Sequence, residues 1–298
     1  MSGAGTVVTV GTFDGIHRGH QAVLAEIVRR ARARGLLSLL VTFEPHPLEV
    51  VNPPAAPKLL TLADEKREIL AQTELDRLAI LRFTPALARL EPVDFVRDVL
   101  RARYGMEELV LGYDHGFGRG RSGDVGLVRE LAAREGFAVD VVDAVRDGDQ
   151  PISSTLIRTA VAHGDLEAAA RWLGRRYSLL GRVEPGAGRG RTLGVPTINL
   201  AAPDPRKLLP PDGVYAVRVH WQGGCWGGMM NQGPRPTFGV GARALEIHLF
   251  EFAGELYGET VRVEWVRRLR DIRTFPSRQA LVEQLVRDAR AARESLNR

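Results

Sequence analysis

Two histidines near the N-terminus have a spacing that suits phosphate chemistry. His17 and His20 close the stretch Gly11-Thr-Phe-Asp-Gly-Ile-His-Arg-Gly-His20, and residues three apart share one side of a helical turn. A helix N-terminus favours anions through its free N–H groups and its dipole, and Gly19 has no side chain to keep a ligand from the backbone. Two imidazoles beside a polyphosphate can stabilise the charge that builds on phosphorus during transfer.

The same histidines fit a plainer interpretation, in which they lie on the surface of an ordinary capped helix. Their context favours nucleotide binding, because the β-branched run Thr6–Val10 ends at Gly11 and the motif therefore joins a strand to a helix. Zinc binding is disfavoured, since no third ligand of the His or Cys type lies nearby in the sequence.

A glycine-rich stretch in the second half, Gly181–Asn199, offers another phosphate site. Its loop N–H groups can wrap phosphates, and its arginines add positive charge. Thr197 and Asn199 alternate along an extended segment and so face the same way, and their hydroxyl and amide oxygens suit a Mg²⁺ ion that bridges substrate phosphates. A flexible hairpin with a buried Thr and Asn is the competing interpretation, and spacing alone does not decide between the two.

The first half of the chain alternates strand and helix patterns, which predicts βαβ units and a parallel sheet. Ligands of such sheets bind beyond the carboxyl ends of the strands, so we expect the site at the loops after Val10, Phe43 and Gly112. The expected strands are Thr6–Val10, Leu36–Phe43, Leu78–Phe83, Leu109–Gly112 and Ala138–Val142. The expected helices are His20–Arg34, Ala63–Leu75, Pro92–Tyr104 and Val125–Glu135.

The second half has a different pattern. Two short helices are expected first, from Ser153/Ser154 to about His163 and from Asp165 to near Gly174. Short strands between Gly/Pro-rich loops then predict an antiparallel sandwich or barrel, closed by an amphipathic helix over Ser277–Ser295. The expected strands are Tyr177–Val183, Thr197–Leu200, Val214–Trp221, Trp226–Asn231, Ala244–Phe252 and Thr260–Val266. We place the domain boundary near Arg175, which gives domains 1–174 and 175–298.

The overall composition is that of a water-soluble globular protein. The chain has 298 residues, which favours two domains, and a net charge of +5 that is carried almost wholly by Arg. Arg suits phosphate because its planar fork donates two parallel hydrogen bonds, although a compositional bias with Arg on solvated helix faces explains the same excess. Cys225 is the only cysteine, so no intrachain disulfide can form and a reducing, cytoplasmic location is expected. We expect neither a signal peptide nor a membrane span.

Four segments of the first half resemble a known set of motifs. The stretch ending in His20 resembles the HxGH signature of the nucleotidylyltransferase superfamily, and Ile152-Ser-Ser-Thr-Leu-Ile-Arg158 resembles its ISSTxxR motif. Without the first motif, the second would read better as a serine-rich helix cap. Thr42-Phe-Glu-Pro-His-Pro47 and Gly112-Tyr-Asp-His-Gly-Phe-Gly-Arg119 are similar to the flavin-facing loops of bacterial FAD synthetases, where aromatic and proline faces can sandwich a planar ring.

This resemblance implies specific roles in the first half. His17 and His20 would be catalytic. The implied ATP-binding residues are Gly11, Phe13, Asp14, His17, Gly19, His20, Ser153, Ser154, Thr155 and Arg158. The implied flavin-binding residues are Phe43, Pro45, His46, Pro47, Asp114 and Phe117. Two positions depart from the family pattern, His115 in place of the usual first Phe of the second loop and Leu156 in place of the Arg often found after Ser-Ser-Thr.

The second half resembles riboflavin kinases. Pro196-Thr-Ile-Asn199 matches their PTxN signature, and three more segments follow in family order: Gly213-Val-Tyr215, Arg235-Pro-Thr-Phe238 and the strand with Glu246. The resemblance implies a six-stranded Greek-key barrel with Glu246 as catalytic base, although the residue alone reads as a solvated strand carboxylate. The implied ATP-binding residues are Gly186, Gly188, Arg189, Gly190, Gly194, Thr197 and Asn199, with Thr197 and Asn199 also holding the metal. The implied flavin-binding residues are Arg270 and Phe275.

Because the motifs cover nearly the whole chain in family order, the chain is identified as a member of the bacterial bifunctional riboflavin kinases/FMN adenylyltransferases. The resemblance implies an N-terminal Rossmann-like nucleotidylyltransferase domain and a C-terminal barrel. It implies that ATP and Mg²⁺ convert riboflavin to FMN and that ATP then adenylylates FMN to FAD, with release of pyrophosphate. We expect small-molecule substrates, no nucleic-acid or membrane partner, and a monomer or weak oligomer.

Two other functions remain open at this point. One is a nucleotidylyltransferase for another substrate with an inactive barrel, against which the kinase motif argues. The other is a basic barrel that binds nucleic acid through exposed aromatic side chains, for which Trp221 and Trp226 beside a Gly-rich hairpin are the candidates.

Overall fold

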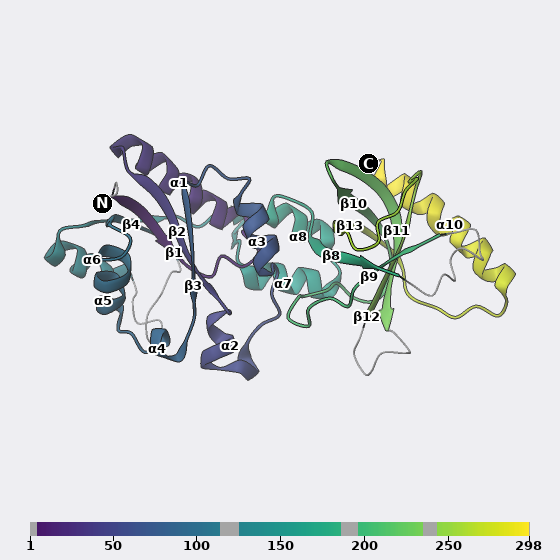
Figure 1. Cartoon of the computed structure of the whole chain (residues 1–298), viewed down its shortest axis with the longest axis horizontal. Coiled ribbons are helices and arrows are strands. Elements are labelled where there is room, and N and C mark those ends of the chain that lie inside the picture. The colour runs from purple at the N-terminus through teal and green to yellow at the C-terminus, as the bar shows by residue number, and fades with distance from the viewer. Residues whose placement is uncertain (1–4, 114–124, 186–195, 235–242, 298) are drawn as a thin grey trace. The chain divides into compact units, whose positions relative to one another are not determined.

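The structure, a computed structural model, describes residues 5–113, 125–185, 196–234 and 243–297 (Figure 1). The chain separates into two compact units, Met1–Ser154 and Thr155–Arg298. This division groups the two short helices α7 (Ser154–His163) and α8 (Leu166–Leu173) with the second unit, apart from the first residue of α7. The predicted domain boundary near Arg175 lies after both helices and stays a prediction.

The first unit is built on a five-stranded parallel sheet with the order β3-β2-β1-β4-β5. Its strands are β1 (Thr6–Val10), β2 (Leu37–Glu44), β3 (Arg77–Arg82), β4 (Met106–Gly112) and β5 (Ala138–Val142). All five predicted strands are confirmed. Alternate residues of β1 enter two separate cores: Val7 packs with α1, and Val8 packs with the helix after Pro92. Helices therefore cover both faces of the sheet, which explains the continuous apolar runs in the sequence.

The helices of the first unit include the four predicted ones, in order, and three short ones that were not predicted, Pro47–Val51, Pro53–Ala55 and Pro85–Ala88. In chain order, the helices are α1 (Arg18–Arg34), α2 (Pro47–Val51), η1 (Pro53–Ala55), α3 (Ala63–Leu70), α4 (Pro85–Ala88), α5 (Pro92–Asp94), η2 (Phe95–Arg101) and α6 (Val125–Glu135). Helix α1 ends at Gly35, whose φ of 65° suits a residue without a Cβ. Helix α3 is five residues shorter than the predicted Ala63–Leu75, because the Thr73 hydroxyl donates to the Leu70 carbonyl and closes a turn there. A small hairpin, β6 (Arg146–Asp147) with β7 (Gln150–Pro151), was not predicted.

The second unit contains a closed six-stranded barrel in which all neighbouring strands are antiparallel. Its strands are β8 (Ser178–Glu184), β9 (Ile198–Leu200), β10 (Gly213–Trp221), β11 (Gly224–Pro234), β12 (Arg243–Leu249) and β13 (Thr260–Arg270). Strand β13 returns to pair with β10 after the β10-β11-β12 meander, which is the Greek-key order. The predicted barrel is confirmed, and the sandwich alternative is wrong.

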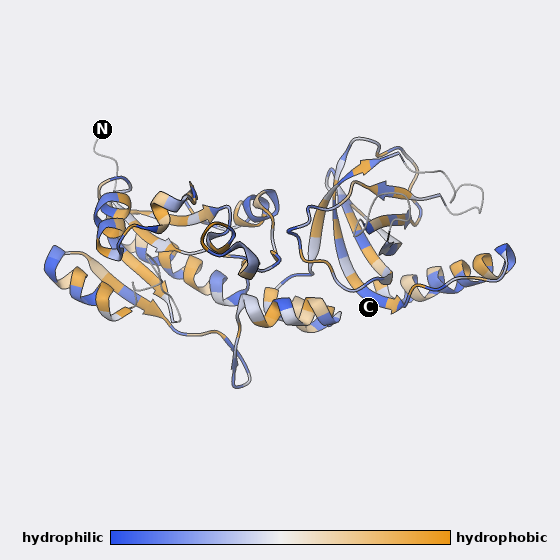
Figure 2. Ribbon diagram, turned by 90° about the horizontal axis from the view of Figure 1, so that it is seen from below, coloured by the Kyte–Doolittle hydropathy of each residue, from blue (hydrophilic) through white to orange (hydrophobic). Residues whose placement is uncertain are grey.

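Helix α10 (Arg278–Leu296) begins after the Ser277 cap, which confirms the helix predicted over Ser277–Ser295, and it packs against one side of the barrel. Leu285, Ala289 and Leu296 pack against a cluster that includes Met229 and Phe250. Figure 2 shows mainly hydrophobic residues along the parallel sheet and alternating hydrophobic and hydrophilic residues along the barrel strands, in line with a sheet covered on both faces and a barrel covered in part.

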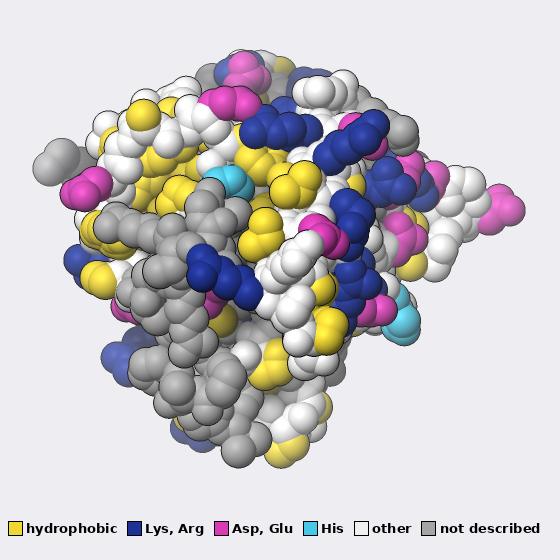
Figure 3. Space-filling view, turned by 90° about the vertical axis from the view of Figure 1, so that its right-hand side faces the viewer, with side chains coloured by type: hydrophobic (Ala, Val, Ile, Leu, Met, Phe, Trp, Pro, Cys, Tyr) yellow, Lys and Arg dark blue, Asp and Glu magenta, His cyan; other side chains and the backbone are white. Residues whose placement is uncertain are grey.

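Some arginines of the second unit pair with acidic side chains. On α10, Arg290 pairs with Glu294 and Arg293 pairs with Glu251. The face in Figure 3 likewise shows Lys and Arg side chains interspersed with Asp and Glu. The pairings of Arg290 and Arg293 fit the interpretation in which these arginines lie on a solvated helix face.

Gln232 of β11 is a polar side chain buried within the barrel. Gln232 is 0% exposed, and its amide nitrogen donates to the Pro210 carbonyl over 2.6 Å. Its amide oxygen accepts from the indole nitrogen of Trp265 over 3.2 Å. The one side chain thus satisfies a loop carbonyl and a strand tryptophan that are far apart in sequence.

Gln232→Leu should destabilise the barrel by about 1–3 kcal/mol, because it leaves the Trp265 N–H and the Pro210 carbonyl buried without these partners. Calorimetry or urea unfolding measures the loss. Gln279→Leu is the control, since Gln279 is exposed on α10. Equal stability of the two variants would contradict the assigned role of Gln232.

Candidate active sites

The loop between β1 and α1 is strained. Phe13 and Ile16 have φ values of 46° and 40°, a left-handed region that costs a non-glycine residue about 1–3 kcal/mol. Such strain persists only where the surroundings fix the backbone. The loop carries the first predicted motif, so its rigidity bears directly on the predicted nucleotide site.

Asp14 anchors this loop. The side chain is 2% exposed, and its carboxylate accepts from the backbone N–H groups of Leu60 and Thr61 over 3.0 and 2.9 Å. The Thr61 hydroxyl also donates to Asp14 over 3.2 Å and accepts from Gly15 N–H over 3.0 Å. Sequence reasoning assigned Asp14 to ATP binding and missed Leu60 and Thr61, to which no motif pointed.

The structure brings His17 and His20 together at the start of α1. Their rings stack with centroids 3.7 Å apart, and Phe13 stacks on His20 at 4.5 Å. His17 caps the helix, with its Nδ1 accepting from the His20 N–H over 3.4 Å. A Cβ at position 19 would lie 3.2 Å from the His17 ring, so glycine there leaves room for that ring as well as for any ligand.

The serine motif meets the same loop. The Ser154 hydroxyl donates to the Asp14 carbonyl over 2.9 Å, which joins residues 140 positions apart. The Ile152 carbonyl lies 3.6 Å from where a Cβ of Gly19 would stand. Ser153 directly precedes this contact. Thr155 and Arg158 continue on α7 in the second compact unit.

The loop after β2 has structural roles that the motif did not suggest. Phe43 packs edge-on against Phe83, with centroids 5.4 Å apart, and joins the core of the sheet. His46 caps α2: its Nδ1 accepts from Leu48 N–H over 3.2 Å, while its own N–H donates to Glu49. Pro45 precedes this cap, and Pro47 is the first residue of α2. The flavin-binding role of these residues stays a prediction, and Asp114, His115 and Phe117 lie outside the described residues.

A row of polar residues crosses the barrel wall in the second unit. Glu246 of β12 stands directly opposite Asn199 of β9 on one side and Asn231 of β11 on the other. Asn199 in turn stands opposite Glu184 of β8. Residues in register point to the same face of a sheet, and here it is the outer face, because Leu245 and Ile247 on either side of Glu246 are buried.

The start of the PTxN segment is tied to the same strand. His248, two residues after Glu246, donates its Nδ1–H to the Pro196 carbonyl over 2.8 Å. Thr197 follows directly and is half-buried, while Asn199 is buried at 7% exposed. The predicted metal residues and the predicted base are thus brought together, although 47 positions separate Asn199 from Glu246.

The two predicted flavin-binding residues of the barrel contact each other. The Arg270 guanidinium lies 5.7 Å from the centre of the Phe275 ring and forms a bidentate ion pair with Asp288 of α10, whose side chain is 4% exposed. Arg273 lies over the same ring at 5.0 Å. The predicted glycine loop, with Gly186, Gly188, Arg189, Gly190 and Gly194, lies outside the described residues.

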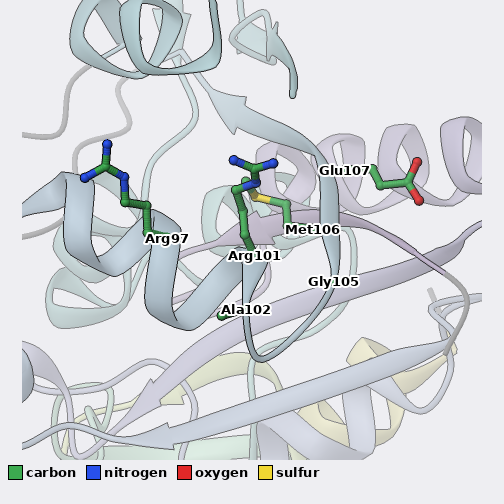
Figure 4. Close-up of a pocket in the computed structure, with 6 residues that line it drawn as sticks. All are labelled: Arg97, Arg101, Ala102, Gly105, Met106 and Glu107. Atoms are coloured by element: carbon green, nitrogen blue, oxygen red, sulfur yellow. The ribbon is translucent and has the colours of Figure 1, made fainter. Parts of the chain in front are cut away.

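A hollow at the amino end of β4 is a poor candidate for either site. Arg97 and Arg101 extend side by side from η2, and Glu107 points away from them (Figure 4). Both arginines already pair with Glu135, and the hollow lies at the strand end opposite to the loops described above. In the described part of the chain, no cluster of three or more His, Cys, Asp or Glu side chains could hold a metal ion.

Two family models match the chain. A model described as FAD synthetase matches residues 2–156, and one described as riboflavin kinase matches residues 173–296. A protein from Pseudomonas fluorescens named bifunctional riboflavin kinase/FMN adenylyltransferase is 39% identical over 97% of this chain and 92% of its own length. The Bacillus subtilis protein of the same name is 34% identical over 97% of this chain and 92% of its own length.

A solved structure named as a macrolide-efflux protein from Streptococcus pneumoniae matches with a TM-score of 0.87 and 32% identity, over 98% of this chain and 95% of that chain. Both units therefore share their folds with a solved structure. The word efflux comes from the name of that protein and is not carried over to this chain. Among the described residues of this chain, none of the helices has the length and apolar character needed to cross a bilayer.

Asp14→Asn should loosen the loop before α1. The Asp14 carboxylate accepts hydrogen bonds from two backbone N–H groups and a hydroxyl with two oxygens, whereas the amide of Asn has only one acceptor oxygen. Hydrogen bonds to a charged group contribute about 1.5–3 kcal/mol each, so amide hydrogen exchange over residues 11–17 should accelerate at least tenfold. Asp64→Asn is the matched control on exposed helix α3 surface. Unchanged exchange in Asp14→Asn would show that the carboxylate does not hold the loop.

Proposed function

The chain belongs to the family of bifunctional riboflavin kinases/FMN adenylyltransferases, and on that premise we propose which residues carry each of its two reactions. The enzyme phosphorylates riboflavin to FMN and adenylylates FMN to FAD. We assign adenylyl transfer to residues 1–174 and the kinase reaction to residues 175–298. The FAD synthetase match ends at residue 156 and the riboflavin kinase match begins at residue 173, close to this boundary, which supports the assignment.

In the adenylyltransferase half, an oxygen of the FMN phosphate attacks the α-phosphorus of ATP. The bond from that phosphorus to the bridging oxygen breaks, and pyrophosphate leaves with the electron pair. The nucleophile is already ionised, so no general base is required. His17, His20, Ser154, Thr155 and Arg158 stabilise the charge in transit. The stacked histidines at the α1 N-terminus and the Ser154 contact to the strained loop support this assignment.

In the kinase half, Glu246 accepts the proton of the ribityl 5′-hydroxyl as that oxygen attacks the γ-phosphorus of ATP, and ADP leaves. One observation carries this assignment: the barrel register sets Glu246 directly opposite Asn199 on the outer face. A base on this face is open to solvent and substrate, whereas the neighbouring leucine and isoleucine of β12 fill the interior.

Thr197 and Asn199 are the residues that would hold Mg²⁺ in the kinase half. Their oxygens are hard ligands, and Asn199 is buried beside two carboxylate residues in register, Glu246 and Glu184, which suits a divalent cation. When bound, Mg²⁺ neutralises negative charge on the phosphates. Arg270 and Phe275 are assigned to the flavin, with Asp288 fixing the guanidinium. The cytoplasmic location, the absence of nucleic-acid and membrane partners and the monomeric or weakly oligomeric state stay predictions.

His20→Ala should accumulate FMN from riboflavin and ATP but make at least ~10²-fold less FAD, because it removes an imidazole that stabilises the transferring phosphorus. Chromatography of riboflavin, FMN and FAD measures both steps in one incubation. His163→Ala, at the exposed end of α7, is the control and should make both products. An equal loss of both activities in a folded His20→Ala protein would refute the two-site assignment.

Glu246→Gln should lower kcat for FMN formation by ~10²–10⁴-fold, because the amide keeps the shape of the side chain but cannot take the proton. Riboflavin binding, followed by flavin fluorescence with ADP and Mg²⁺, should hardly change, since the lost interaction belongs to the transition state. Glu294→Gln on exposed α10 surface is the control. Turnover of Glu246→Gln within about threefold of wild type would make Glu246 structural and leave the reaction without a general base at this position.

A further inference from the structure

Lys66 is a buried cation that neither proposed reaction uses. It lies on α3 and is 9% exposed, which is unusual for lysine. Its Nζ donates to the Thr12 carbonyl over 2.7 Å and lies 3.5 Å from the Thr42 hydroxyl. The Thr42 hydroxyl itself donates to the same Thr12 carbonyl over 3.1 Å. One ammonium thus meets two chain segments at a single point.

These two segments carry the two parts of the proposed adenylyltransferase site. Thr12 belongs to the strained loop that leads to His17, and Thr42 opens the segment that leads to Pro47. Thr12 follows β1 and Thr42 lies near the end of the neighbouring strand β2, and the register of the two strands pairs Val10 with Val41. Lys66 therefore contacts the junction between the loop proposed for ATP and the loop proposed for the flavin.

Burial of the Lys66 ammonium costs free energy, because the charge is removed from water. Burial lowers the pKa of its ammonium, while the carboxylates of Asp14 and Glu44 oppose that shift. A buried ammonium needs polar partners, and the Thr12 carbonyl and the Thr42 hydroxyl supply them. Because these partners belong to two functional loops, the charge also fixes the geometry of those loops.

We propose that Lys66 is a positioning residue for adenylyl transfer, whose ammonium fastens the Thr12 carbonyl to Thr42 and so sets the distance between the nucleotide loop and the flavin-facing loop. The inference rests on the proposed assignment of these loops to ATP and FMN. The attacking FMN oxygen and the α-phosphorus must come within about 3–3.5 Å in line, and a misplacement of about 1 Å costs about 10²-fold in rate. The junction at Lys66 lies where the first loop leaves β1 and two residues before β2 ends at Glu44, so a small shift there moves both substrates relative to each other.

The test is Lys66→Met in the full-length protein, assayed with supplied FMN, ATP and Mg²⁺. Methionine keeps most of the side-chain length and removes the charge and the donor. We expect kcat for FAD formation to fall about 10²-fold, with KM for ATP and FMN changed by less than about threefold, because alignment rather than binding is lost. Riboflavin phosphorylation by the same molecules should stay at the wild-type rate. Lys58→Met, at an exposed lysine of the preceding loop, is the matched control and should match wild type in both reactions.

Two further variants separate positioning from a role in stability alone. Lys66→Arg keeps the charge and the donors, and should recover at least about tenfold of the lost kcat, since a guanidinium can still reach both acceptors. Thr42→Val removes the hydroxyl at the junction and should also lower kcat. In the double variant Lys66→Met/Thr42→Val, the fold-loss of kcat should be smaller than the product of the fold-losses in the two single variants. A residue that only stabilised the fold would give neither the split between kcat and KM nor this coupling.

The proposal would be overturned if kcat of Lys66→Met stayed within about threefold of wild type. It would also be overturned if the fold-loss of kcat in the double variant equalled the product of the two single-variant losses. If calorimetry shows that Lys66→Met does not fold, Thr42→Val decides: a fall in kcat at constant KM supports the proposal, and unchanged kcat overturns it. His20→Ala distinguishes the two levels of inference. If His20→Ala still forms FAD at the full rate, the proposed site is refuted. If His20→Ala loses FAD formation but Lys66→Met keeps it at the full rate, only the role of Lys66 is refuted.

Discussion

Hydrogen-bond register between strands is the constraint on which both sites depend. In the barrel, the pairing of β12 with β9 and β11 sets Glu246 in one row with Asn199 and Asn231. Side chains alternate along a strand, so a slip of one residue would turn Glu246 inward and expose Leu245. The buried leucine and isoleucine on either side of Glu246 make that slip costly, because it would exchange apolar surface for a carboxylate in the core. The packing of the interior thereby fixes which residues face the substrate.

In the parallel sheet, the same kind of constraint brings two loops to one edge, and side chains then fix their shape. The register of β1 with β2 pairs Val10 with Val41, so the chain leaves β1 at Gly11 beside the last residues of β2, which ends at Glu44. The loop after β1 takes strained backbone angles that hydrogen bonds from distant residues hold in place, above all those to the Asp14 carboxylate. The backbone strain and the buried charges of this region are thus offset by polar contacts that close around the loop from α3 and its preceding segment.

Polar groups within both units are placed in pairs or networks. Gln232 links Trp265 to a loop carbonyl, and Arg270 is held by the buried carboxylate of Asp288. A buried polar group without partners costs about 1–3 kcal/mol, so these contacts restrict the barrel and α10 to one arrangement. Arg270 also shows that one side chain can serve both structure and site: it is tied to α10 and lies near Phe275, the other residue assigned to the flavin.

The sequence determined the kind and order of the elements, because apolar periodicity reflects which faces a strand or helix must bury. It predicted the five strands of the parallel sheet, the six strands of the barrel and the closing helix, and its motifs identified the family. Helix ends were less certain: α3 ends at Leu70, where a side-chain contact closes a turn that periodicity does not reveal. The small β6–β7 hairpin had no pattern long enough to predict.

The tertiary structure alone decided how the functional residues are held. Asp14 meets Leu60 and Thr61 across 46 and 47 positions, and Lys66 meets Thr12 across 54. It also showed that Phe43 packs against the core of the sheet and that His46 caps a helix, and the contact of both residues with a flavin stays a prediction. Local sequence patterns report the burial of a residue's own element. The partner of a buried carboxylate or ammonium depends on which distant segments the closed sheet brings alongside, and that is a property of the folded chain.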